Sequence, residues 1–333
     1  LYFSVLACEH ILERPFLLPG YNLHVSPRGT MISGRYFQQT LFSMLSSGRH
    51  PLAVALLAVS VTLGVTPAHS RTYIEAVDHK NLRVCADGNL MPYSNKKQEG
   101  FENKIAALLA KKLGRPLVYE WYPAVSPKFV RDTLGLKKCD VIIGVSAGTK
   151  SVLHTNPYYR TGYVMVVPKD SGIKARGLDD PEMANLKIGV VAGSQPSRLV
   201  AKYDLLDKMR SYVLRFDTRK KSIGKLMIQD LKEGLTDVVL MFGPKAAYHT
   251  REEELDAELI PIKSLDNHEN RMDFLITIGV RIGEQNWKRT LNKLIKENQD
   301  EITAILEEYG VPLMKIKKGR RRRDKTSEET SQK

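Results

Sequence analysis

Two short and almost wholly apolar segments, CDVIIGV at residues 139–145 and TDVVLMF at residues 236–242, constrain the fold of this chain most strongly. Strands that are apolar on both faces belong in the middle of a sheet that helices cover. Each segment follows a stretch with helical spacing of its apolar residues, which favours strand–helix–strand units. The sequence therefore predicts two similar α/β units.

The first unit alternates strands and helices. We expect strands at residues 82–86, 117–122 and 139–145, and helices at residues 101–113 and 128–138. Right-handed crossovers between such elements give a parallel sheet in which the first and third strands are neighbours.

The second unit begins after Pro168 and lies between two apolar strands, predicted at residues 162–167 and 274–280. Within it we expect strands at residues 187–191, 212–216, 236–242 and 259–262, and helices at residues 197–203, 223–233 and 245–249. A long helical run follows at residues 287–309. Two extended crossings between lobes are what a hinge requires, and the expected site is a cleft at the carboxyl ends of the strands.

The N-terminal part of the chain has the features of a secretory signal. The run Pro51–Val65 has the length of a signal-peptide apolar region, Arg49 and His50 precede it, and Ala68 and Ser70 fit a small-x-small cleavage site. We expect residues 1–70 to be a leader, with an over-extended reading frame upstream of the signal. A buried helix and a retained membrane anchor are the alternatives for this run.

Charge and motifs exclude several classes of protein. The 333 residues carry a net charge of +14, part of which lies in a basic tail at residues 315–333 that we expect to be disordered. No basic face is interleaved with aromatic residues, so nucleic-acid binding is not expected. The sequence holds no catalytic motif, no metal-ligand spacing and no haem-attachment motif, so we expect no enzyme activity, no metal and no cofactor.

Two of the three cysteines, Cys85 and Cys139, lie in the expected mature chain, in the first and third predicted strands. An even count in an exported protein suggests a disulfide, which in the chain-entropy model would contribute roughly 4 kcal/mol. Two buried free thiols are the alternative.

The order of these elements, with a Gly-Phe-Glu helix start and a Pro-Tyr-Tyr segment before the crossing strand, resembles periplasmic solute-binding proteins of the polar amino-acid class. The resemblance covers about Arg71–Met314. It implies a two-lobed periplasmic binding protein fold of type II, similar to solute-binding family 3, with two crossovers between the lobes. Lobe 1 is then residues 71–165 plus 270–314, and lobe 2 is residues 166–269.

A narrower set of motifs resembles the subfamily associated with quinoprotein dehydrogenases, the MxaJ and XoxJ type. These motifs are LRVCAD at 82–87, PYSN at 92–95, GFENKIA at 100–106, KCDVIIGV at 138–145, NPYYRTGYV at 156–164 and EYGVPL at 308–313. The paired Cys85 and Cys139 resemble that subfamily's disulfide. The resemblance implies a non-catalytic periplasmic accessory protein that binds and helps activate or mature a PQQ-dependent methanol dehydrogenase, with its cytochrome c as a second candidate partner and no stable membrane insertion after signal cleavage.

Amino-acid-binding members hold the ligand carboxylate with an Arg before the Pro-Tyr pair and the amine with an Asp after the strand that corresponds to TDVVLMF. Here neither residue is present, although Lys150 is a candidate replacement for the Arg. An ABC-transporter receptor for a small non-amino-acid ligand is therefore the alternative function.

Candidate binding residues remain at the predicted strand ends. They are Asp87, Asn89, Phe101, Glu102, Ser146, Thr149, Tyr158, Tyr159, Arg160, Gln195 and Phe242. Arg160 is the best candidate for an anion contact, and a structural carboxylate near the hinge is its alternative partner. For Tyr158 and Tyr159, packing at the hinge is favoured over stacking on a ligand.

Overall fold

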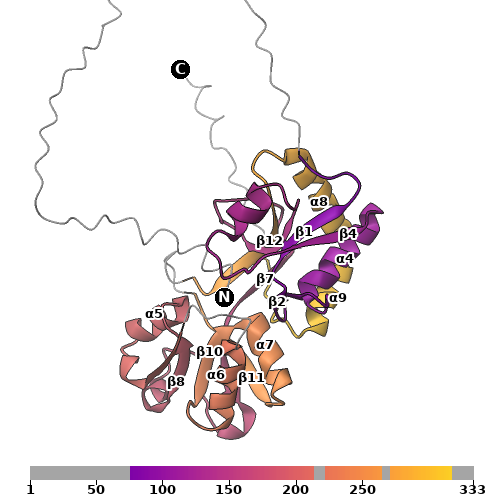
Figure 1. Ribbon diagram of the computed structural model, residues 1–333. Helices are drawn as coiled ribbons and strands as arrows, with labels where there is room; N and C mark the ends of the chain where they lie inside the picture. The colour runs from indigo at the N-terminus through magenta and orange to yellow at the C-terminus, as the bar shows by residue number, and fades with distance from the viewer. Residues whose placement is uncertain (1–75, 214–221, 265–270, 317–333) are drawn as a thin grey trace, which may run out of the picture. The chain divides into compact units, whose positions relative to one another are not determined.

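The computed structural model describes residues 76–213, 222–264 and 271–316 (Figure 1). The expected leader and nearly all of the expected tail lie outside these described residues. The fold is an α/β arrangement in which one long strand, β7 (Tyr159–Pro168), takes part in both lobes.

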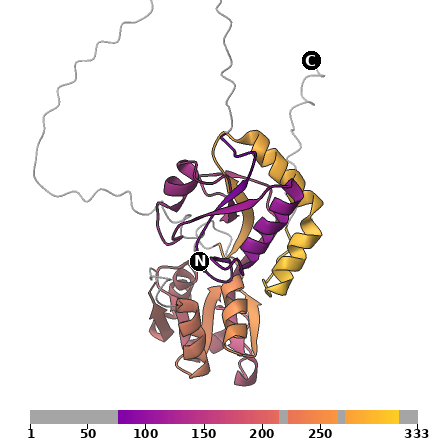
Figure 2. The ribbon, with the colours of Figure 1, turned by 45° about the vertical axis from the view of Figure 1, so that its right-hand side comes forward.

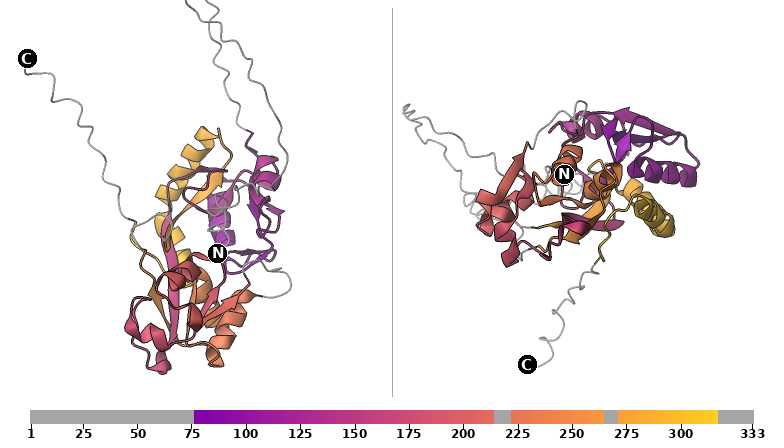
Figure 3. Two further views of the ribbon diagram at one scale, coloured as in Figure 1. Left: turned by 90° about the vertical axis from the view of Figure 1, so that its left-hand side faces the viewer. Right: turned by 90° about the horizontal axis from the view of Figure 1, so that it is seen from below.

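Strand β7 is the first crossing between the lobes. Its first part, Tyr159 to Gly162, pairs antiparallel with β12 (Asp273–Val280). Its remainder pairs antiparallel with β10 (Val238–Phe242) and with β11 (Ala257–Pro261). Figures 1 and 3 show β7 running from the part of the molecule that contains α4 to the part that contains α6.

The principal sheet of the described residues has eight strands. Six follow the order β5-β12-β7-β10-β8-β9, while β6 pairs with β12 and β11 with β7. The remaining members are β5 (Ile142–Ser146), β6 (Leu153–His154), β8 (Ile188–Val191) and β9 (Met209–Tyr212). Strand β8 runs parallel to both β10 and β9, so the carboxyl ends of β8 and β10 lie at one edge of the sheet.

Lobe 1 departs from the predicted order of strands. Strand β1 (Leu82–Ala86) pairs in parallel with β4 (Leu117–Trp121), and β2 (Asn89–Leu90) pairs with β3 (Ser94–Asn95). The third predicted strand begins as β5 only at Ile142 and then pairs with β12.

The predicted contact between the first and third strands is present only before β5 begins. Val84 and Val141 form an isolated parallel bridge, supported by the hydrogen bonds Asp140 N to Arg83 O (2.8 Å) and Cys85 N to Val141 O (3.0 Å). The prediction that the two strands are neighbours therefore holds for one bridge and not for a full ladder.

Helix α4 (Phe101–Leu113) has the predicted bounds. It begins at Gly100, where a Cβ atom would lie 2.1 Å from the carbonyl oxygen of Tyr93, so only glycine fits. Lys104 and Lys112 of α4 form salt bridges with Glu308 and Glu301 of α9 (Gln299–Glu308) at 2.6 and 2.5 Å, and the two helices lie side by side in Figure 2.

The prediction of a helix at residues 128–138 is wrong in its bounds and type. The structure has a short π-helical turn at Arg131–Gly135, in which the N–H of Lys138 reaches the carbonyl of Thr133. Lys137 has a φ of 59°, a left-handed conformation that ends a right-handed helix.

The long helix predicted at residues 287–309 is two helices, α8 (Gln285–Glu297) and α9. Asn298 separates them with a φ of −122°, and its side-chain Nδ2 donates a hydrogen bond of 2.7 Å to the carbonyl of Leu294. A side chain that bonds the backbone in this way competes with continued helix.

Lobe 2 contains helices α5 (Gln195–Lys202), α6 (Ile223–Lys232) and α7 (Gly243–Glu252). Helices α6 and α7 lie side by side in Figures 1 and 2, and Lys225 and Glu253 join them by a 3.0 Å salt bridge. An apolar cluster that includes Met227, Ile228 and Ala246 packs between these helices and the sheet.

Two predicted bounds in lobe 2 are also corrected. Helix α7 starts at Gly243 rather than at Lys245, because Pro244 fits the first turn of a helix. The strand predicted at residues 212–216 is β9 at Met209–Tyr212, and residues 214–216 lie outside the described part of the chain.

Candidate functional site

Asp87 follows the carboxyl end of β1, where the sequence places a binding residue. Its carboxylate is buried and accepts hydrogen bonds from the backbone N–H groups of Asn89 (2.9 Å) and Ala124 (2.7 Å). Its carbonyl accepts a bond from the hydroxyl of Ser94 (2.7 Å). Asp87 therefore holds the loop after β1 together, while Asn89 at the start of β2 is exposed.

Phe101 and the Tyr158–Tyr159 pair are core residues of lobe 1. Phe101 is fully buried, with ring centroids 5.2 Å from Tyr93, 6.4 Å from Tyr159 and 5.8 Å from Tyr309. Tyr158 lies 5.0 Å from Tyr159 by the same measure. This placement favours the packing role for the two tyrosines.

Glu102, the next residue, carries a buried carboxyl group. Its Oε1 has no hydrogen-bond partner among the described residues, and burial raises the pKa of the carboxyl well above its ordinary value. The group packs directly against Gly144 of β5, where φ is 83° and an added Cβ would lie 1.8 Å from Oε1. A glycine at this point makes room for the carboxyl.

Ser146 and Thr149 lie together at the end of β5. The carbonyl of Ser146 accepts hydrogen bonds from the Thr149 hydroxyl (2.8 Å) and N–H (3.3 Å), and the carbonyl of Thr149 lies 2.8 Å from Nε2 of His154. Both side chains are buried, and these bonds fix the turn that links β5 to β6.

Arg160 contacts a carboxylate of the neighbouring crossing strand. Its Nε and one terminal nitrogen both lie 2.8 Å from Oδ1 of Asp273, and its other terminal nitrogen donates to the carbonyl of Lys315 at 2.9 Å. Asp273 is therefore the structural carboxylate that the sequence analysis gave as the alternative partner of Arg160. Burial alone would raise the pKa of Asp273. The hydrogen bond from the Ser264 hydroxyl and the guanidinium of Arg160 outweigh this effect and hold the pKa below its ordinary value.

The carboxyl edge of lobe 2, by which we mean the ends of β8 and β10 with the starts of α5 and α7, carries the last two predicted residues. Gln195 begins α5, and its Oε1 is buried without a hydrogen-bond partner in the described chain. Phe242 ends β10 and packs in an aromatic cluster with Tyr163 (5.4 Å) and Phe274 (6.0 Å). Ser194, just before Gln195, is 7% exposed and its Oγ is likewise without a partner.

Lys245, in the first turn of α7, was not among the predicted site residues. Burial lowers the pKa of its ammonium to about 8, against the attraction of Asp87, which opposes the shift. Within the described residues it forms neither a hydrogen bond nor a salt bridge. The sequence signal that could have found it is a lysine directly after a buried strand and a Gly-Pro helix start, at the predicted cleft.

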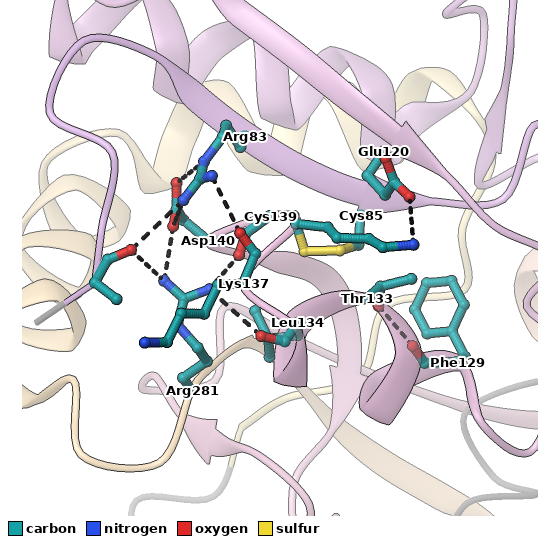
Figure 4. The surroundings of a disulfide bond; sticks show 12 residues. Arg83, Cys85, Glu120, Phe129, Thr133, Leu134, Lys137, Cys139, Asp140 and Arg281 are labelled. Atoms are coloured by element: carbon teal, nitrogen blue, oxygen red, sulfur yellow. Dashed lines mark hydrogen bonds and ion pairs between the residues drawn. A yellow bond between two sulfur atoms is a disulfide. The ribbon is translucent and has the colours of Figure 1, made fainter.

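Cys85 and Cys139 form the disulfide that the sequence suggested (Figure 4). Beside it, Arg281 forms salt bridges of 2.7 Å with both Asp140 and Glu284, and Arg83 forms one of 2.7 Å with Asp140. Arg281 also donates to the carbonyls of Ala76, Leu134 and Cys139. We call this region the disulfide end of lobe 1.

Residues 76–213, 222–264 and 271–316 contain no cluster of three or more His, Cys, Asp or Glu arranged to hold a metal ion. None of the helices in these ranges has the length and apolar character that crossing a membrane requires.

The model of a known family, the bacterial extracellular solute-binding proteins, family 3, matches residues 82–312. The chain belongs to this family. A solved structure of the periplasmic binding protein XoxJ from Methylobacterium extorquens AM1 is 34% identical, with a TM-score of 0.59, and the match covers 71% of this chain and 100% of that one. The chain is thus a family 3 protein of the MxaJ and XoxJ type.

Two further relatives of this solute-binding family agree. MxaJ from Methlophaga aminisulfidivorans MPT is 26% identical with a TM-score of 0.63, over 70% of this chain and 100% of that one. Protein MoxJ of Methylorubrum extorquens is 27% identical over 300 residues, which is 86% of this chain and 99% of that protein. The two-lobed fold expected from the sequence is confirmed by these matches.

As a family 3 protein, the chain is notable for how its predicted binding residues are used. Asp87, Thr149 and Arg160 are engaged by groups of their own lobe or hinge, and Phe101, Tyr158 and Phe242 are packed in aromatic clusters. Among the predicted residues in the described chain, Glu102, Tyr158 and Gln195 each have a buried side-chain atom without a hydrogen-bond partner.

Proposed function

We propose that the protein is a non-catalytic periplasmic accessory protein of methanol oxidation, which binds a PQQ-dependent methanol dehydrogenase and helps to activate or mature it. The observation that carries this proposal is the similarity to XoxJ over the whole length of that protein, together with the similarity to MxaJ and MoxJ. The cytochrome c that accepts the dehydrogenase's electrons is a second partner in this proposal.

The engagement of Arg160 supports a protein partner over an amino acid. A planar guanidinium is well suited to binding a ligand carboxylate, but here Asp273 occupies it on the adjacent strand. Since the two charged clamps of amino-acid-binding relatives are also missing from the sequence, the lobes are proposed to hold a polypeptide loop of the dehydrogenase. A complex with the dehydrogenase bound far from both lobes' facing ends would contradict this part of the proposal.

The proposal includes export of the chain to the periplasm. The run at residues 51–65 acts as a signal peptide that is cleaved after Ser70, and the mature chain is free in the periplasm with lobe 1 at residues 71–165 and 270–314 and lobe 2 at residues 166–269. N-terminal sequencing of the protein from periplasm tests the cleavage position directly.

The alternative is a receptor of an ABC transporter for a small non-amino-acid ligand. The buried polar atoms of Ser194 and Gln195 favour it, because buried polar groups without partners mark places where a ligand or water can bind. Tight binding of one small molecule together with closure of the lobes would decide for this function.

A pull-down of the chain from residue 71 onward, from a periplasmic extract of its native host, tests the accessory function. Recovery of a quinoprotein dehydrogenase or its cytochrome c, in smaller amount at high salt, supports the proposal, because an excess of Lys and Arg over Asp and Glu favours acidic partners. No recovery, together with a thermal shift caused by a small solute, contradicts it.

A further inference from the structure

Strand β4 forms a free edge of lobe 1. Among the described strands it pairs with β1 alone, in parallel, so its other side faces no strand. Pro116 lies directly before the strand, and Pro123 follows it by two residues. Because proline has no N–H group, these two residues confine any further pairing to the short segment between them.

The outer peptide groups of β4 have no partner within the described chain. On the inner side, the carbonyl of Pro116 and the N–H of Tyr122 form hydrogen bonds of 2.9 and 3.0 Å with β1. Successive residues of a strand direct their peptide groups to opposite edges, so those of Leu117, Tyr119 and Trp121 point away from β1. A row of unpaired N–H and C=O groups is a template on which another strand can pair.

The side chains of β4 add an anchor to this edge. The rings of Tyr119 and Trp121 are stacked, with centroids 4.4 Å apart and planes 13° apart, and both residues are partly exposed. Asn103 of α4 holds the Tyr119 hydroxyl by a hydrogen bond of 3.0 Å, and Val118 on the other face of the strand is 44% exposed. Aromatic side chains held in this way often dominate the energy of a protein interface.

The charge around β4 indicates what can bind there. Residues 111–138, which include β4 and its flanking loops, contain seven Lys and Arg residues but only two acidic residues, Glu120 and Asp132. Both are already paired, Glu120 with Lys138 at 3.4 Å and Asp132 with Arg131 at 2.8 Å. The excess of cations favours an acidic partner and disfavours a second copy of this chain, which carries the same cations.

We propose that the free edge of β4 pairs with an extended, acidic segment of methanol dehydrogenase, which adds a strand to lobe 1 and places an apolar side chain on the Tyr119–Trp121 pair. This inference rests on the accessory function proposed above and names the surface that the partner uses. The carboxyl end of β4 lies beside that of β1, because Trp121 is opposite Ala86, the residue before Asp87. A segment bound at the strand ends of lobe 1 can therefore continue along β4.

Hydrogen–deuterium exchange, measured by mass spectrometry on the chain from residue 71 onward with and without purified methanol dehydrogenase, tests the pairing. In the free chain the amides of Tyr119 and Trp121 should exchange rapidly, whereas those of Val118 and Glu120, which face β1, should exchange slowly. The dehydrogenase should slow exchange at Tyr119 and Trp121 by about tenfold or more. The matched control is β9, the strand at the lobe 2 end of the principal sheet, where exchange should not change.

Two substitutions test the side chains in a binding assay with the same dehydrogenase. Trp121→Ala should weaken binding by about tenfold or more, whereas Leu206→Ala, which removes an exposed apolar side chain from lobe 2, should not. Lys138→Met should weaken binding and reduce its dependence on salt. Its control is Lys293→Met, which removes the lysine of another exposed ion pair, that with Glu297, and should leave binding unchanged.

The outcomes distinguish this inference from the proposed function. Slower exchange at β4 and weaker binding by Trp121→Ala support both. If the dehydrogenase binds while exchange at β4 is unchanged, the inference is wrong and the accessory function stands. If exchange at β4 slows as the chain alone is concentrated, a second copy occupies the edge and the inference is wrong. If the dehydrogenase does not bind at all, both are wrong. The exchange experiment uses the wild-type chain, so a variant that fails to fold does not affect it.

Discussion

At the disulfide end of lobe 1, the four charged side chains of Arg83, Asp140, Arg281 and Glu284 are joined by salt bridges, whereas Lys245 at the carboxyl edge of lobe 2 is joined to no described residue. Both regions remove charge from water, although Lys245 is only partly buried, and such removal is costly unless the charge is paired. The difference suggests that the first region contributes more to the stability of the fold than the second. Substitutions in the first region should therefore cost more stability.

The largest loss of stability is expected for Arg281→Met. This substitution leaves Arg83 as the ion-pair partner of Asp140 and leaves Glu284 without its salt bridge, so urea unfolding should show a loss of roughly 3–5 kcal/mol. The matched control is Lys293→Met in the exposed pair with Glu297, which should cost less than about 1 kcal/mol. Equal losses for the two variants would contradict the contrast between buried and exposed pairs.

Removal of the disulfide comes next. The double variant Cys85→Ser, Cys139→Ser frees a loop whose ends are 54 residues apart, and it should lose roughly 2–4 kcal/mol in the same unfolding experiment. Because the disulfide holds Asp140 next to β1, the double variant combined with Arg281→Met should lose less than the sum of the separate losses. Strict additivity would show that the disulfide and the salt bridges act independently.

A smaller effect is expected at the crossing strands. Arg160→Met leaves the partly buried Asp273 without its ion pair, at a cost of about 1.5–3 kcal/mol. The same variant should bind the dehydrogenase like the wild type, because Asp273 already occupies the guanidinium. Loss of binding with unchanged stability would instead identify Arg160 as an anion contact.

The smallest and most pH-dependent effect is expected at Glu102. Burial raises the pKa of this carboxyl in the folded state, so its contribution to stability is present in full below the unfolded pKa and is lost as pH rises through the folded pKa. Glu102→Gln should remove that dependence and gain on the order of 1 kcal/mol at pH 8 relative to wild type. Thermal unfolding between pH 4 and pH 8 measures the difference, and parallel curves would contradict a raised pKa.

The sequence predicted the architecture because it depends on local patterns. The apolar run in β10 and the helical spacing and terminal glycine of α4 are readable from neighbouring residues alone. The break at Asn298 and the π-helical turn before Cys139 were missed, since each depends on one hydrogen bond that the spacing of apolar residues does not encode.

The candidate site was harder to predict than the fold. Candidate residues could be placed at strand ends, but whether Arg160 faces a ligand or Asp273 depends on the register of β7 against β12. Lys245 was missed because a lysine at the start of a helix is usually solvated, and only the packing of the whole lobe shows that this one is partly buried.

The most direct test of the accessory function measures the dehydrogenase itself. Purified methanol dehydrogenase is assayed for methanol-dependent reduction of its cytochrome c before and after incubation with the chain from residue 71 onward, with buffer as the blank. The proposed function predicts a higher rate or a larger active fraction that saturates with added protein and falls at high salt. An unchanged dehydrogenase, with no complex detected at any ratio, would contradict it.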